Sequence, residues 1–189
     1  MPMSSVPALG AESPARSLAV RRVIAIVLGA VVVAISAQIS IPIPGSPVPI
    51  TLQGFAVLLV GGMLGAGPGA AALVLYLLAG TMGLPVFAPV GLPGVARLLG
   101  PTGGYLLAFP VAAAVTGALA RSGGIGRSAL AALLGMLVIH LGGIAQLAVI
   151  TGSFALPLTA TGPLLAADLV KVVLAALLIA RFRSKFQPT

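Results

Sequence analysis

Residues 163–181 read PLLAADLVKVVLAALLIAR, an apolar run that carries two opposite charges near its middle. Asp168 is one of only two acidic residues in the chain, and Lys171 is the only lysine that is not at the C-terminal end. A charge at the centre of a bilayer costs about 2.5–3.5 kcal/mol on insertion scales. Residues three apart on a helix share a face, so these two charges can neutralise each other. The run therefore predicts a membrane helix that carries a functional site.

The composition of the whole chain predicts an all-α integral membrane protein. Hydrophobic residues make up 59% of the chain and charged residues 6%, with a mean hydropathy of +1.22. A soluble domain carries about 25% charged residues. A spanning helix takes about 20 residues, so 189 residues accommodate about six spans and no separate soluble domain. Without cysteine, no disulfide or thiolate metal site is predicted.

Six transmembrane helices are predicted, and they divide the chain into a membrane domain at residues 18–182, a disordered tail at 1–17 and a basic tail at 183–189. The predicted spans cover residues 18–39, 52–64, 70–82, 103–120, 128–150 and 163–180. Between the first two lies IPIPGSPVPIT (residues 41–51), in which four prolines forbid a helix and favour an extended path. This uncharged segment alternates proline with apolar residues, which predicts a lid packed over an apolar pocket.

The positive charges predict the orientation in the membrane. Eight of the ten basic residues fall on one side of a six-span chain, which places both termini in the cytoplasm: Arg16, Arg21, Arg22, Arg121, Arg127, Arg181, Arg183 and Lys185. This rule accounts for the net charge of +8 better than nucleic-acid binding does. The two basic residues that it leaves out are Arg97, on the outer side, and Lys171.

Asp168, Lys171 and Arg97 form the main candidate site. Their net charge of about +1 suits a ligand with one negative charge. The alternative is a buried ion pair that only fixes helix packing, although such pairs often give no net stability.

Other candidates surround the start of the fourth predicted span. Exposed backbone N–H groups at a helix N-terminus attract anions, so Gly103 and Gly104 are candidate ligand contacts or a simple helix cap. Tyr105 is a candidate pocket wall or an interfacial anchor. Gln53 can donate to and accept from a polar ligand, or it can bond the loop backbone.

Three further polar residues lie inside predicted spans. Tyr76 and Gln146 have similarly open roles. His140 is the one histidine, without metal partners, so packing or an interhelical hydrogen bond is favoured over catalysis.

Small residues four apart recur in the first predicted span, where they allow close approach of another helix, within the chain or from a partner subunit: Ala25, Gly29, Ala30 and Ala34. Enzyme motifs such as H-E-x-x-H and G-x-S-x-G are absent, and Asp168 has no acidic partner for acid–base chemistry. The chain is therefore predicted to be no enzyme, with no metal or cofactor.

Four stretches in a fixed order resemble the BioY family, the biotin-specific substrate-binding (S) components of energy-coupling factor (ECF) transporters. They are IPGSPVPITLQGFAVLLVGGMLG (43–65), GLPVFA (83–88), RLLGPTGGYLLAF (97–109) and DLVK (168–171). The similarity spans roughly residues 20–182, and PVPITLQ with LLGPTGGY is its most specific part. One departure lies between Phe87 and Arg97, where APVGLPGVA replaces the more polar, glycine-rich stretch that the family leads us to expect.

The resemblance implies a six-helix S-component fold in the cytoplasmic (inner) membrane, a biotin site near its outer face, a transmembrane coupling (T) subunit and two cytosolic ATPases. It implies that Arg97, Asp168 and Lys171 line the biotin site, and that the small residues of the first helix dock the T subunit. Biotin suits the residues: Asp168 can accept from the ureido N–H groups, Lys171 can donate to the ureido oxygen, and Arg97 or a helix N-terminus can hold the carboxylate. Which cation holds the carboxylate stays open.

Three functions are weighed. The first is high-affinity biotin binding and uptake as the substrate-capture component of an ECF-type ABC transporter. The second is a solitary proton-coupled carrier for biotin or a similar monoanionic vitamin. The third is a membrane assembly factor in which Asp168 and Lys171 are a packing pair.

Overall fold

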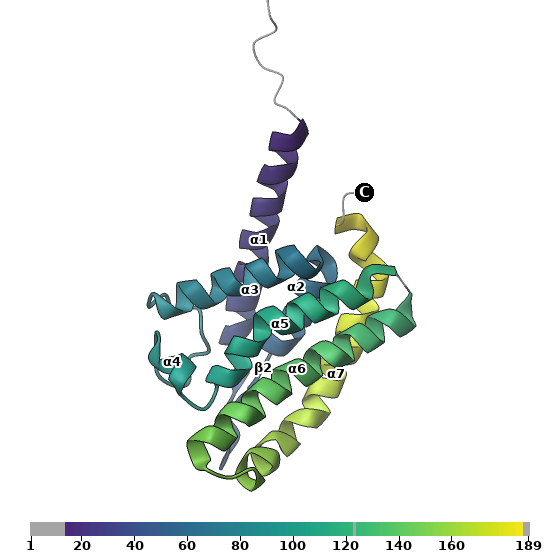
Figure 1. The fold of residues 1–189 in the computed structure, drawn as a ribbon. Coiled ribbons are helices and arrows are strands. Elements are labelled where there is room, and N and C mark those ends of the chain that lie inside the picture. Colours follow the sequence, from purple (N-terminus) through teal and green to yellow (C-terminus); the bar gives the residue numbers. More distant parts are fainter. Residues whose placement is uncertain (1–13, 123, 187–189) are drawn as a thin grey trace, which may run out of the picture.

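The computed structural model describes residues 14–122 and 124–186, which form a bundle of long helices (Figure 1). The long helices of this part are α1 (Pro14–Gln38), α2 (Gln53–Leu64), α3 (Ala66–Thr81), α5 (Gly103–Leu119), α6 (Ile125–Thr151) and α7 (Ala155–Phe186). Shorter elements join them: strands β1 (Ser40–Ile41) and β2 (Ile50–Thr51), helix α4 (Ala96–Leu99) and the 3₁₀ turn η1 (Ala120–Ser122). The prediction of a mostly helical fold is confirmed.

The surface of the bundle is apolar to a degree that soluble proteins do not show. Within the described residues, α1 over Arg16–Gln38 and α6 are long and apolar enough to cross a membrane by length and composition. The apolar helices α2, α3 and α5 are shorter, with 12 to 17 residues each. Large apolar side chains lie exposed along one face of α1: Val23, Ile24, Val27, Leu28, Val31, Val32 and Ile35. These features are those of a membrane protein.

Several helix boundaries differ from the predicted ones. α1 begins at Pro14, so residues 14–17 of the predicted disordered tail are helical, and residues 1–13 lie outside the described residues. α7 begins at Ala155, although residues 151–162 were predicted to be a connection. Pro157 falls in its first turn, where the missing N–H costs nothing, and membrane helices tolerate proline deeper inside. At the other end α7 continues into the predicted basic tail.

Glycine lets α2, α3 and α5 cross at close range. A Cβ on Gly61 of α2 would lie 2.4 Å from the carbonyl oxygen of Ala113 on α5, and one on Gly117 of α5 would lie 2.5 Å from the backbone nitrogen of Ala66 on α3. Helix backbones approach this closely only through small residues. α5 thus packs against α2, α3 and α6 at the centre of the bundle.

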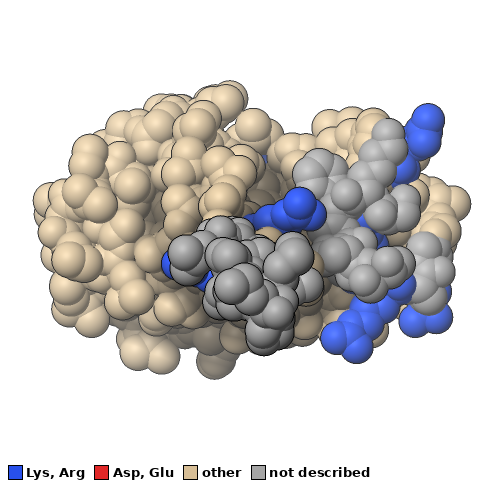
Figure 2. Space-filling model, turned by 90° about the horizontal axis from the view of Figure 1, so that it is seen from above, with Lys and Arg blue, Asp and Glu red and all other residues tan. Residues whose placement is uncertain are grey.

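The first turn of α1 and the last turn of α7 lie at the same end of the bundle (Figure 1). Viewed from that end, basic side chains gather on the surface, and none of the described residues drawn there is acidic (Figure 2). The exposed arginines of the chain are Arg16, Arg21, Arg22, Arg121, Arg127 and Arg181. Arg183 is instead buried and donates from Nη2 to the carbonyl oxygen of Gly117 over 3.0 Å.

The proline-containing segment between α1 and α2 is not helical, as predicted, but instead of following one extended path it folds back through a turn at residues 44–45, and its two ends pair with each other. Ser40 pairs with Thr51 and Ile41 with Ile50 in an antiparallel ladder. These four residues flank the prolines and keep the N–H groups that a strand needs. The short ladder fixes both ends of the segment, and it places residues 48–51 along the wall of a cavity.

Candidate functional site

A cavity lies among α2, α5, α6 and α7, beneath the segment that precedes α2. It holds about 660 Å³ of space free of protein atoms, its open mouth included. Its walls are mostly apolar, as in most small-molecule sites. The polar and charged side chains among its lining residues are Thr51, Gln53, Arg97, Thr102, Tyr105, His140, Asp168 and Lys171. Residues 48–51 of the predicted lid line this cavity.

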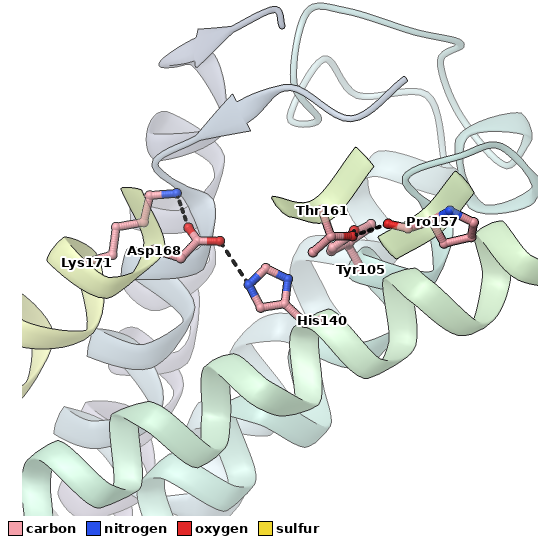
Figure 3. A network of polar contacts seen from close by, with 6 residues as sticks. All are labelled: Tyr105, His140, Pro157, Thr161, Asp168 and Lys171. Carbon is pink, nitrogen blue, oxygen red and sulfur yellow. Dashed lines mark hydrogen bonds and ion pairs between the residues drawn. The ribbon is translucent and has the colours of Figure 1, made fainter. Parts of the chain in front are cut away.

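Asp168 joins α7 to α6 inside this cavity (Figure 3). Lys171 Nζ donates to its Oδ1 over 2.5 Å, so the predicted pair on one helix face is confirmed. His140 points from α6 to the other oxygen, with Nε2 3.0 Å from Oδ2. Asp168 and His140 are each 8% exposed. A buried carboxylate needs such partners, because burying an unpaired charge is costly.

Two further lining residues, Tyr105 and Gln53, are each hydrogen-bonded to a residue that is not among those lining the cavity. Tyr105, at the start of α5, has its hydroxyl 3.3 Å from Thr161 Oγ1, which in turn donates to the carbonyl oxygen of Pro157 over 2.7 Å (Figure 3). Gln53 donates from Nε2 to the hydroxyl of Tyr76 over 2.6 Å. Tyr105 is therefore a wall of the pocket, which was one of its two predicted roles, and the Gln53 amide is turned toward α3.

Arg97 extends from α4 toward the same cavity and holds the loop before it. Its Nη1 donates to the carbonyl oxygen of Val90 and its Nη2 to that of Ala88, while Nε is buried without a hydrogen-bond partner. Burial lowers the pKa of Arg97, but a guanidinium stays charged in proteins. Its partners are neutral carbonyls, whereas Lys171 has a carboxylate. Within the described residues the surplus positive charge of the site therefore lies at Arg97.

Gln146 of α6 fixes α4 in turn. Its Nε2 donates to the carbonyl oxygens of Leu98 over 2.7 Å and Gly100 over 2.8 Å. Two hydrogen bonds from one side chain fasten the turn that carries Arg97. The role of Gln146, left open by the sequence, is thus a clamp on the backbone of this turn.

Gly103 and Gly104 lie where helices meet. A Cβ on Gly103 would lie 1.9 Å from the carbonyl oxygen of Leu98, and one on Gly104 would lie 2.1 Å from that of Gly142 on α6. Neither glycine is among the residues that line the cavity. Close packing accounts for both, and their contact with a ligand stays a prediction.

The small residues of α1 are placed partly inside the bundle. Gly29 and Ala30 are buried, and a Cβ on Gly29 would lie 3.0 Å from the Cβ of Ala72 on α3. Ala25 and Ala34 are half-buried. Gly29 and Ala30 therefore serve packing within the chain, and docking of a partner by the four residues stays a prediction.

His140 lines the cavity but was not among the site residues predicted from the sequence. A lone histidine in an apolar helix was interpreted as packing or an interhelical hydrogen bond, and the structure shows an interhelical contact, with Asp168 of α7 as the partner. The available signal was the rule that ionisable residues inside membrane segments pair with one another. His140 and Asp168 both lie in the middle of apolar runs, so the rule pairs them.

Fold and site define a helical membrane protein with a charged small-molecule pocket, and comparison with known proteins identifies the family. A sequence model of the BioY family matches residues 10–188. The "Probable biotin transporter BioY" of Pyrococcus horikoshii is 38% identical over 79% of this chain and 88% of its own length. The "Biotin transporter BioY" of Thermotoga maritima is 40% identical over 80% of this chain and 89% of its own. The chain belongs to the BioY family.

A solved structure shares the fold. It is the crystal structure at 2.1 Å of the S-component for biotin from an ECF-type ABC transporter. It superposes with a TM-score of 0.81 and 24% identity, covering 92% of this chain and 95% of that one. The predicted S-component fold and the predicted family are confirmed.

Proposed function

We propose that this protein binds biotin and takes it up as the substrate-capture component of an ECF-type transporter. The proposal is carried by one observation: a single cavity holds Asp168, paired with Lys171 and His140, and also a separate cation, Arg97. The relatives named above are biotin transporters, and the superposed structure is a biotin S-component. A solitary proton-coupled carrier is not favoured, since that structure belongs to a multi-subunit transporter.

The chemistry of biotin matches the two ends of the cavity. Its ureido ring has two N–H donors and one carbonyl acceptor, which suit the carboxylate of Asp168 and the ammonium group of Lys171. Its single carboxylate suits the uncompensated charge of Arg97. Its thiophane ring and valerate chain suit apolar walls such as Phe109 and Ile139.

The direct test is binding of labelled biotin to the purified protein in detergent, with thiamine and riboflavin as competitors. We expect an excess of unlabelled biotin to displace the label and the other two vitamins to leave it bound. A protein that retains its fold but binds one of the competitors instead of biotin would contradict the proposal.

The proposal includes six spans in the cytoplasmic membrane with both termini in the cytoplasm. This topology is supported by the first turn of α1 and the last turn of α7, which lie at the same end of the bundle, and by the basic residues gathered there. Because the chain has no cysteine, single cysteines can report topology without background. In intact cells, an impermeant thiol reagent should label Leu92→Cys and should label Gly126→Cys only after lysis; the reverse pattern would invert the orientation.

The partners proposed with this function are a T subunit and two cytosolic ATPases. The test is uptake of labelled biotin by cells that express this chain alone or together with such partners. Concentrative uptake that depends on ATP and on the partners supports the assignment. Equal uptake without partners that collapses with the proton gradient would favour the solitary carrier.

A further inference from the structure

We propose that His140 is a positioning residue that fixes the carboxylate of Asp168 for the ureido end of the ligand. This inference rests on the proposed function and adds to it a residue from α6, outside the motifs that resemble the family. The observations that carry it are the contact with Asp168, the support of the imidazole ring and the place of both in the cavity wall.

The two oxygens of Asp168 are held from opposite directions. Lys171 Nζ lies 2.5 Å from Oδ1, and His140 Nε2 lies 3.0 Å from Oδ2. Lys171 contacts only one oxygen of Asp168 and does so through a long side chain on the same helix. With this contact alone, the carboxylate could still turn about its last side-chain bond. A second contact from α6 removes that freedom. A carboxylate has about four lone-pair sites, so one on each oxygen remains for a ligand donor.

The imidazole ring is itself held in place. It is 8% exposed, and the ring of Tyr105 meets it edge-on, with 6.2 Å between centroids and 85° between planes. The hydroxyl of Tyr105 is fixed by Thr161 at 3.3 Å. A ring packed against α5 and directed at α7 can keep one orientation before a ligand arrives, and pre-organisation of this kind raises affinity by lowering the ordering cost of binding.

The tautomer follows from the contact. For Nε2 to face a carboxylate it must carry the proton, which leaves Nδ1 of a neutral ring as an acceptor. Nδ1 and Nε2 are both buried, and neither makes a well-aligned hydrogen bond among the described residues, so Nε2 meets Oδ2 of Asp168 as a close polar contact at 3.0 Å. The polar contact of the ring in this structure is therefore with Asp168. A side chain that keeps a donor at the position of Nε2 should be able to take the place of the imidazole.

The test compares three variants by equilibrium binding of labelled biotin to the purified protein. His140→Phe keeps the aromatic packing against Tyr105 and removes the donor, whereas His140→Gln supplies an amide N–H close to the position of Nε2. Leu141→Ala, on the lipid-facing side of the same turn, is the matched control. Residues that orient the ligands of a metal ion typically contribute about 10–100-fold, and we take the same scale for a residue that orients a carboxylate. We expect a loss of about that size in His140→Phe, at least partial rescue in His140→Gln, and no loss in the control.

Two further readouts separate positioning from packing. In an Asp168→Asn background, adding His140→Phe should weaken biotin binding by less than about a further 2-fold, because the effects of residues that act through one another are not additive. The fold-loss should also be equal for biotin and for its uncharged amide, since His140 serves the ureido end. Full additivity with Asp168→Asn, or a His140→Gln protein as weak as His140→Phe, would assign His140 to packing and overturn the inference.

The outcomes for the two proposals are distinct. If the wild-type protein binds biotin and His140→Phe binds it equally well, the inference fails and the proposed function stands. If the folded wild-type protein does not bind biotin, the proposed function fails and the inference falls with it. If His140→Phe does not fold, His140→Leu, which also lacks a donor, takes its place in the same comparison with wild type and His140→Gln in the two Asp168 backgrounds.

Discussion

Replacing Arg97 by glutamine should abolish the preference of this protein for biotin over its uncharged amide. Lys171 is neutralised by Asp168 at 2.5 Å, whereas Arg97 has only backbone carbonyls as partners within the described residues. A guanidinium has five N–H donors, so after two loop contacts it keeps capacity for a carboxylate. We therefore expect the carboxylate of biotin at Arg97, which is one of the alternatives that the sequence left open.

The size of the effect follows from the burial of this cation. Two unit charges about 4 Å apart interact by roughly 4 kcal/mol at an effective dielectric constant of 20. Arg97 is 6% exposed, so screening is limited, but part of this energy offsets desolvation of the ligand carboxylate. Hydrogen bonds to charged groups contribute about 1.5–3 kcal/mol net. We take about 2 kcal/mol, which is roughly a 30-fold loss of biotin affinity.

The assay is equilibrium competition between labelled biotin and either biotin or biotinamide. Arg97→Gln should weaken biotin about 30-fold and biotinamide little, so the ratio of the two affinities approaches one. Arg97→Lys is the control, because it keeps the charge and loses the fork that holds two carbonyls of the loop. The reasoning is refuted if Arg97→Gln leaves the ratio unchanged while Lys171→Gln removes it.

Three other variants test the rest of the site and the fold. Asp168→Asn should weaken biotin and biotinamide alike, by about 1.5–3 kcal/mol, because it removes the charged acceptor of the ureido end; equal affinity in a binding assay would exclude Asp168 from the site. Gln146→Leu should lower biotin affinity by about 10-fold through loss of two hydrogen bonds to the turn that carries Arg97, with Gln146→Glu no better because a carboxylate cannot donate. Gly61→Val should lower the melting temperature in detergent, because its side chain would clash with Ala113 on α5, whereas Gly126→Ala, with open space around it, should not.

The sequence predicted the bounds of a helix well where glycine or proline limits an apolar run. Apolar length specified α2 to within a residue, since glycine and proline bound it on both sides. The prediction failed at α7, because Pro163 was interpreted as a helix start and the helix begins at Ala155. A proline is tolerated more readily inside a membrane helix than inside a helix of a soluble protein. The extent of a membrane helix therefore cannot be inferred from proline alone.

The charged residues of the site were predictable, but their connections were not. An ion pair three residues apart is a local feature, and Asp168 with Lys171 appeared as expected. The contact of His140 with Asp168 joins positions on two helices, and helix rotation decides whether such residues meet. The same holds for Arg97, whose partners are carbonyl oxygens that carry no signature in a sequence.

One helix supports both ends of the pocket. α6 carries His140, which contacts the acceptor Asp168 on α7, and Gln146, which clamps the turn that bears Arg97. The two residues are six positions apart, which is roughly 9 Å along a helix axis. The spacing between the residue that contacts Asp168 and the residue that holds the turn of Arg97 is therefore set by one helix. It follows that a shift of α6 along its axis would move His140 and Gln146 together and keep their spacing, whereas a change within α4 would displace Arg97 by itself.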